Sequence, residues 1–96
     1  MSTKEAYKQK MEAELDLAKA KLAELKARAD SSAADARIQY AEQFNVLEQK
    51  VDATKAKLKE LSDASEDGWE RLKEGVEASW SALSTAVRHA AAKFKN

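Results

Sequence analysis

The stretch Ser62-Asp-Ala-Ser-Glu-Asp-Gly68 (SDASEDG) carries the strongest helix-breaking signal in this 96-residue chain. Asp63 and Glu66 have the spacing of a capping box, in which two side chains satisfy free backbone N–H groups where a helix begins. Acidic residues gather there, as the positive end of a helix dipole favours, and Gly68 has a low helix propensity. The sequence therefore predicts a helix boundary here, with a second helix from about residue 66 to residue 94.

A second candidate boundary is Asp30-Ser-Ser-Ala-Ala-Asp35 (DSSAAD), where helix-tolerant alanines alternate with residues that prefer caps. Without a turn there, residues 1–62 form one long, heptad-rich coiled-coil helix, followed by an amphipathic helix over residues 63–96. Breaks at both places predict a bundle of three helices of about 26 to 29 residues each. An unbroken chain would form a helix on the order of 130 Å long, which needs partner chains for stability. The sequence leaves these alternatives open.

The composition favours an all-α fold. The chain has no proline, two glycines and 35% charged residues, as expected of long helices or coiled coils. We expect long amphipathic helices that form an oligomeric coiled coil or helical bundle, since a small domain buries only about 60 to 65% of its unfolded surface. The 17 basic and 17 acidic residues cancel, so we expect no binding to nucleic acid.

One apolar stripe runs from Tyr7 to Phe94 at a mean spacing of about 3.6 residues, with Thr54 and Ser65 as its polar members. From Leu15 to Ala29, and again from Leu47 to Ser65, its steps alternate between three and four residues, which predicts a left-handed coiled coil. The predicted seam consists of Leu15, Leu22, Leu25, Tyr40, Phe44, Leu47, Val51, Leu58 and Leu61.

After Ser65 the stripe changes to an eleven-residue Trp/Leu/Val repeat, in which Trp69 recurs as Trp80, and this period favours a straighter helix. Residues 77–87, EASWSALSTAV, lack any charge between Glu77 and Arg88. Their polar positions are serine and threonine rather than the lysine of a membrane-surface helix, which favours helix packing. The predicted interaction surface consists of Trp69, Leu72, Val76, Trp80, Leu83, Val87 and Phe94.

A weak calcium-binding signal overlaps the boundary at 62–68. Asp63, Ser65, Asp67 and Glu74 fit positions 1, 3, 5 and 12 of an EF-hand loop. Position eight, however, is Glu70 instead of an apolar residue, and such a loop would interrupt the stripe. We therefore expect an acidic, capped helix start and no metal ion.

Without a nucleophile motif, a phosphate loop or zinc spacing, we also expect no enzyme activity, no cofactor and no small-molecule substrate.

The opening MSTKEAYKQKMEAELDLAKAKLAELKARAD and the ending ASEDGWERLKEGVEASWSALSTAVRHAAAKFK resemble a family of short bacterial coiled-coil proteins labelled as stress-response proteins. The tryptophan repeat after SEDGW is the most distinctive part of the resemblance. The resemblance implies a bacterial cytoplasmic setting and a link to salt or similar stress. It implies no enzyme activity and no cofactor, and it carries no functional residue over to this chain.

The sequence thus predicts a non-enzymatic coiled-coil protein that self-assembles or acts as a scaffold through its apolar stripe, as a homo-oligomer. The alternative is lipid or membrane-surface binding by the C-terminal amphipathic helix. The N-terminal residues MSTKEAYKQK lack the apolar core of a signal peptide, and no run of about 20 apolar residues could span a bilayer. The expected location is the cytoplasm.

Overall fold

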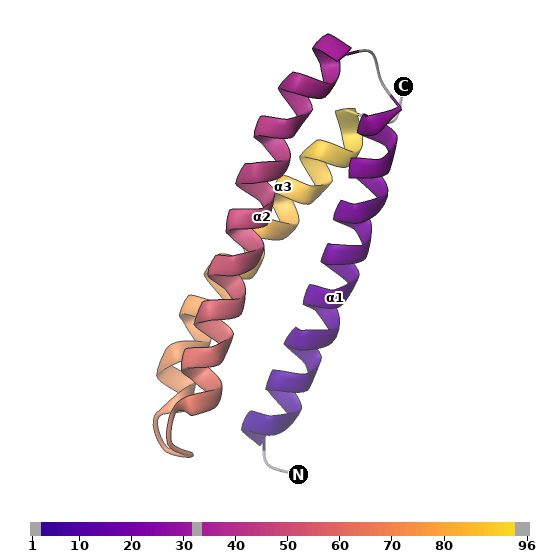
Figure 1. The fold of residues 1–96 in the computed structure, drawn as a ribbon. Coiled ribbons are helices and arrows are strands. Elements are labelled where there is room, and N and C mark those ends of the chain that lie inside the picture. The colour runs from indigo at the N-terminus through magenta and orange to yellow at the C-terminus, as the bar shows by residue number, and fades with distance from the viewer. Residues whose placement is uncertain (1–2, 32–33, 94–96) are drawn as a thin grey trace.

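The computed structural model describes residues 3–31 and 34–93, which form three α-helices (Figure 1). Helix α1 spans Thr3–Asp30, α2 spans Ala34–Asp63 and α3 spans Trp69–Lys93. The chain ascends α1, returns along α2 and ascends again along α3, so that α2 is antiparallel to both other helices (Figure 1). The bundle measures 52 × 20 × 16 Å. The predicted all-α class is confirmed, and the described residues contain no strand.

The chain turns back after α1, at the second of the two candidate boundaries. The backbone N–H of Ser31 donates to the carbonyl of Arg28 at 3.2 Å and closes the last turn of the helix. Helix α2 begins at Ala34, and residues 32 and 33 lie outside the described residues. Of the alternatives that the sequence left open, the structure therefore has the turn, and residues 1–62 do not form one helix.

The connection between α2 and α3 lies where SDASEDG predicts a boundary, but its capping residue differs. The N–H of Gly68 donates to the side-chain oxygen of Ser65 at 3.1 Å and to its carbonyl at 3.0 Å. The N–H of Trp69 donates to the same carbonyl at 3.2 Å. Because Asp63 still belongs to α2, it cannot cap the following helix, and α3 begins at Trp69 rather than near residue 66.

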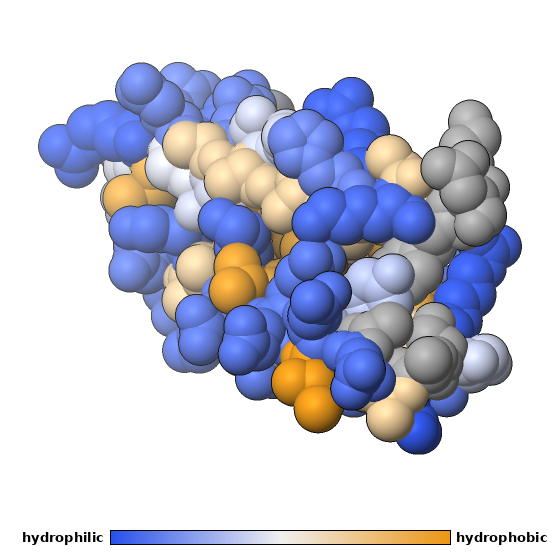
Figure 2. Space-filling view, turned by 90° about the horizontal axis from the view of Figure 1, so that it is seen from above, coloured by the Kyte–Doolittle hydropathy of each residue, from blue (hydrophilic) through white to orange (hydrophobic). Residues whose placement is uncertain are grey.

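The apolar stripe forms the core of the bundle. Leu25, Leu61, Val76 and Leu83 are completely buried, as is Thr54, whose hydroxyl donates to the carbonyl of Lys50 at 2.9 Å. This bond satisfies the one buried polar member of the stripe within its own helix. The other buried hydrophobic residues are Tyr7, Met11, Leu15, Ala18, Leu22, Ala29, Phe44, Leu47, Val51, Leu58, Trp69, Val87 and Ala90. From above, the bundle surface is mainly hydrophilic, and its most hydrophobic side chains lie in separate patches (Figure 2).

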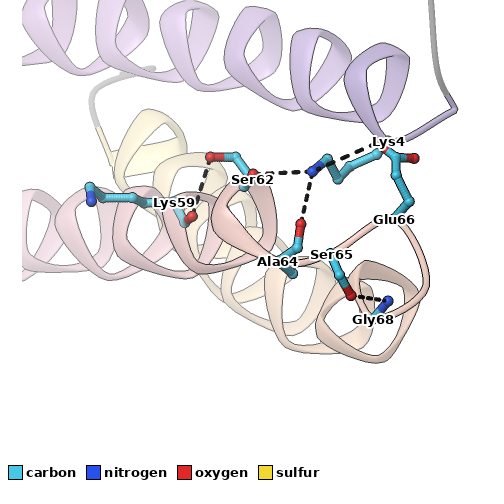
Figure 3. A network of polar contacts seen from close by, with 7 residues as sticks. All are labelled: Lys4, Lys59, Ser62, Ala64, Ser65, Glu66 and Gly68. Carbon is cyan, nitrogen blue, oxygen red and sulfur yellow. Dashed lines mark hydrogen bonds and ion pairs between the residues drawn. The ribbon is translucent and has the colours of Figure 1, made fainter.

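Lys4 connects the start of α1 to the junction of α2 and α3 (Figure 3). Its ammonium group donates to the carbonyl of Ala64 at 2.9 Å and to that of Ser62 at 3.3 Å, and it lies 3.9 Å from the Glu66 carboxylate. The last carbonyls of a helix have no partner within the helix, so this lysine satisfies groups that α2 leaves free. Lys4 therefore ties the start of α1 to the end of α2 and to the connection that leads into α3.

We expect Leu83→Ala to destabilise the fold by about 2–5 kcal/mol, because a fully buried leucine leaves a cavity when it is shortened. Leu17→Ala is the matched control, since Leu17 is 72% exposed and its truncation should change the free energy of unfolding by less than about 0.5 kcal/mol. Urea unfolding followed by circular dichroism measures both. Equal losses in the two variants would contradict the packing described above.

Lys4→Met should lower the free energy of unfolding by about 1–2 kcal/mol, because it removes the donor for two carbonyls while keeping a long side chain. Lys10→Met removes the same charge from an exposed position of α1 and should have little effect. Thermal unfolding at low and high salt distinguishes the hydrogen bonds from charge effects alone. Equal losses in both variants would show that Lys4 acts only through its charge.

Candidate interaction surface

The predicted interaction surface of α3 lies mostly inside the bundle. Trp69 is 5% exposed, Val87 is 8% exposed, and Val76 and Leu83 are fully buried. Leu72 and Trp80 are partly buried against the same core, and Phe94 lies outside the described residues. These side chains already have apolar partners within the chain, and their use as a contact with a second chain stays a prediction. The exposed part of EASWSALSTAV includes the small residues Ala78, Ser81 and Ala82.

The predicted coiled-coil seam also packs within one chain. Tyr40 is partly buried, and the remaining eight seam residues are buried: Leu15, Leu22, Leu25, Phe44, Leu47, Val51, Leu58 and Leu61. Among the described residues, the large hydrophobic side chains that are exposed are Leu17, Ile38 and Val46, on α1 and α2. Single exposed apolar side chains are normal on soluble domains. Within residues 3–31 and 34–93, most of the stripe is therefore covered by the other helices of the same chain.

Tyr7 lies in an aromatic cluster between α1 and α3. Its ring centroid is 5.8 Å from that of Trp69, and the Lys73 ammonium lies 5.1 Å from the Tyr7 centroid and 6.0 Å from the Trp69 centroid. Both distances fit cation–π attraction. The Tyr7 hydroxyl oxygen is buried and makes no hydrogen bond to the described part of the chain. Burial, followed by the nearby negative charge of Glu77, raises the pKa of Tyr7 to about 12.

A long groove separates α1 from α2 on one side of the bundle. It consists of two hollows of about 400 and 430 Å³ that share Lys19 of α1 and Lys55 of α2. Leu15 and Leu58 line the first hollow, and Leu22 and Val51 line the second. The proximity of Lys55, together with desolvation, lowers the pKa of Lys19. The sequence does not reveal this pairing, because the two lysines belong to different helices and show no local motif.

The four residues of the EF-hand-like pattern do not form a calcium loop. Asp63 ends α2, and its carboxylate accepts a hydrogen bond from Lys59 at 3.3 Å. The hydroxyl of Ser65 accepts from the Gly68 N–H, and Glu74 is exposed within α3, beyond the turn that contains Asp67. Within the described residues, no three His, Cys, Asp or Glu side chains lie together as metal ligands. A twelve-residue loop cannot form here because Trp69 already begins a helix.

Comparisons with protein-family models, with curated proteins and with solved structures found no match. Over residues 3–31 and 34–93, none of the helices combines the length and apolar character required of a membrane span.

Tyr7→Phe should remove part of the loss of stability at alkaline pH. A phenol whose pKa is raised from 10.0 to about 12 by folding stabilises the native state below pH 10, and this contribution disappears as the pH rises toward 12. The wild type should therefore lose stability between pH 9 and pH 11 more steeply than the variant. Urea unfolding at several pH values measures the difference, and equal slopes would contradict a buried Tyr7 hydroxyl.

Proposed function

We propose that this protein is a non-enzymatic helical-bundle protein that self-assembles by exchanging α1 between copies. The observation that carries the proposal is the phase of the apolar stripe across the turn. Leu25 and Ala29 in α1 are followed at helical spacing by Ala33, Ala36 and Tyr40, although the chain folds back between them. A sequence that forms only a helical hairpin does not need its apolar residues to keep helical spacing across the turn. A sequence that also forms one continuous helix needs this spacing.

The connection between α1 and α2 is compatible with such a helix. Residues 30–35 contain no glycine or proline, and two of them are alanine. A continuous helix from Thr3 to Asp63 would be about 90 Å long and would present its α1 part to the α2–α3 pair of a second copy. The partner would then re-form the contact of Tyr7 with Trp69 and that of Lys4 with Ala64.

Exchange of α1 requires little additional contact surface. Each contact that α1 would make with a second copy is one that it already makes within the closed chain. This differs from assembly through an exposed patch, for which the described residues offer Leu17, Ile38 and Val46, with Leu17 beside Trp80 in a shallow hollow. The proposed setting is the bacterial cytoplasm under salt or a similar stress. Its support is the resemblance of the SEDGW junction and the following tryptophan repeat to the stress-response family.

Lipid-surface binding by α3, the alternative from the sequence, faces a larger structural obstacle. Trp69 and Leu83 are buried, so α3 would have to leave the bundle before its apolar side could enter a membrane interface. Flotation with anionic vesicles separates the two functions. Assembly predicts that the protein remains below the vesicle fraction, whereas lipid binding predicts that it floats with a blue shift of tryptophan emission.

Ala34→Pro should hold the protein in its closed, monomeric form. Proline fits the first position of α2, where the N–H has no helical partner, but it blocks a helix that continues from Asp30 through residue 34. Ser31→Ala is the opposite variant, because it raises helix propensity in the same connection. After incubation at high concentration, we expect a dimer for the wild type, more dimer for Ser31→Ala and a monomer for Ala34→Pro.

Light scattering gives the molar mass, and small-angle X-ray scattering distinguishes the shapes. The closed chain has a Cα radius of gyration of 15.5 Å, which an exchanged dimer must clearly exceed. A wild type that stays monomeric at every concentration would refute the proposal. A dimer that persists in Ala34→Pro would show that association uses a different surface.

A further inference from the structure

The groove between α1 and α2 has an apolar floor and lysines on both sides. Leu22 and Val51 form the floor of the larger hollow, and Ala23 lies at its side. Lys19 and Lys55 stand at one end of this hollow, where it joins the neighbouring one. Its other end is crossed by the ion pair of Lys26 and Glu48, at 3.9 Å. The hollow therefore has an end with two lysines and Asp52, an apolar middle, and an end closed by the ion pair.

Lys19 and Lys55 differ from the other lysines of the groove. Three others have acidic partners: Lys8 with Glu12 at 3.8 Å, Lys26 with Glu48 at 3.9 Å, and Lys59 with Asp63 at 3.3 Å. Neither Lys19 nor Lys55 has an acidic partner within 4.0 Å in the described residues. The two instead approach each other across the groove, from opposite helices. The two positive charges repel each other, Asp16 and Asp52 offset this repulsion in part, and a bound anion would relieve the remainder.

We propose that the groove binds a single-chain anionic amphiphile of the fatty-acid class, with its carboxylate between Lys19 and Lys55 and its hydrocarbon chain over Leu22, Ala23 and Val51. A carboxylate accepts hydrogen bonds from two ammonium groups, and a hydrocarbon chain gains by covering apolar surface. The hollow volume of about 430 Å³ lies within the range of small-molecule sites.

The charges beside the lysines favour one head group over an extended polyanion. Asp16 and Asp52 lie three residues before Lys19 and Lys55, respectively, and Glu12 and Glu48 lie farther out along the groove. Nucleic acid or polyphosphate running along the groove would meet these carboxylates after leaving the central lysines. One carboxylate with an apolar tail contacts the lysine pair and the hydrophobic floor, and it shares the cationic end of the hollow with the single carboxylate of Asp52.

This site does not depend on whether α1 is exchanged between copies. Helix α1 supplies Lys19 and Leu22, and α2 supplies Lys55 and Val51, whether the two helices belong to one chain or to two. A ligand that bridges them stabilises their contact in either arrangement. Binding and assembly therefore succeed or fail separately.

Titration calorimetry with sodium dodecanoate, below its aggregation concentration, tests the site. We expect binding of one dodecanoate per groove, a raised melting temperature, and binding at least tenfold weaker for hexanoate and for the uncharged detergent dodecyl maltoside. The double variant K19Q/K55Q should lose at least tenfold in affinity. The matched control K10Q/K57Q removes the same charge from exposed positions outside the groove and should bind as the wild type does.

Ala23→Gln provides a second test, because it places a longer polar side chain beside the floor at an exposed helical position. It should weaken dodecanoate binding while leaving the melting temperature of the free protein unchanged. Equal binding of dodecyl maltoside, or equal loss in K10Q/K57Q and K19Q/K55Q, would overturn the proposal. Tight binding of inorganic polyphosphate that depends on Lys19 and Lys55 would also overturn it, in favour of a simple anion site.

Discussion

The structure depends on the burial of a single apolar stripe. Each described residue that is buried belongs to this stripe or lies next to it in the helical pattern, from Tyr7 in α1 to Ala90 in α3. A lone amphipathic helix of this length could not remain stable in water, since most helix stability in proteins comes from packing of the apolar face. The chain turns back at two places, so that the three segments of the stripe pack against one another and are buried.

Much of this fold could be predicted from the sequence. Spacing identifies the residues of one helix face, which is why Leu25, Leu61 and Leu83 were placed correctly on the stripe that forms the core. The boundary near Gly68 is also local, since it depends on cap-forming and glycine residues. The turn near Asp30 could not be predicted with the same certainty, because its alanines suit a helix and the choice depends on packing between distant segments. The cap at Ser65 was missed since Asp63 has equally suitable chemistry, and only the end of α2 decides between them.

The candidate sites were less accessible to sequence reasoning than the fold. The tryptophan surface was recognised as apolar, but periodicity does not show whether its partner belongs to the same chain or to another. The contact of Lys73 with Tyr7 and the approach of Lys19 to Lys55 both join residues of different helices. Such contacts depend on the rotation and offset of whole helices, which no local pattern contains. Charged residues that are predicted to lie on the solvent-exposed side of a helix can therefore meet across a groove, although no local sequence pattern indicates the contact.

The closed bundle and an exchanged dimer would have nearly the same core, so the balance between them must arise outside it. Three contributions to the free-energy difference between the two states remain. They are the conformation of residues 30–34, the entropy lost on association and the contacts at the helix ends. Lys4 contributes equally to both states, since the carbonyls of Ser62 and Ala64 are available to it in either one. The repulsion between Lys19 and Lys55 also recurs wherever α1 meets α2. The connection between α1 and α2 is consequently the part of the chain in which a small change in sequence could select one state, without altering any residue of the core.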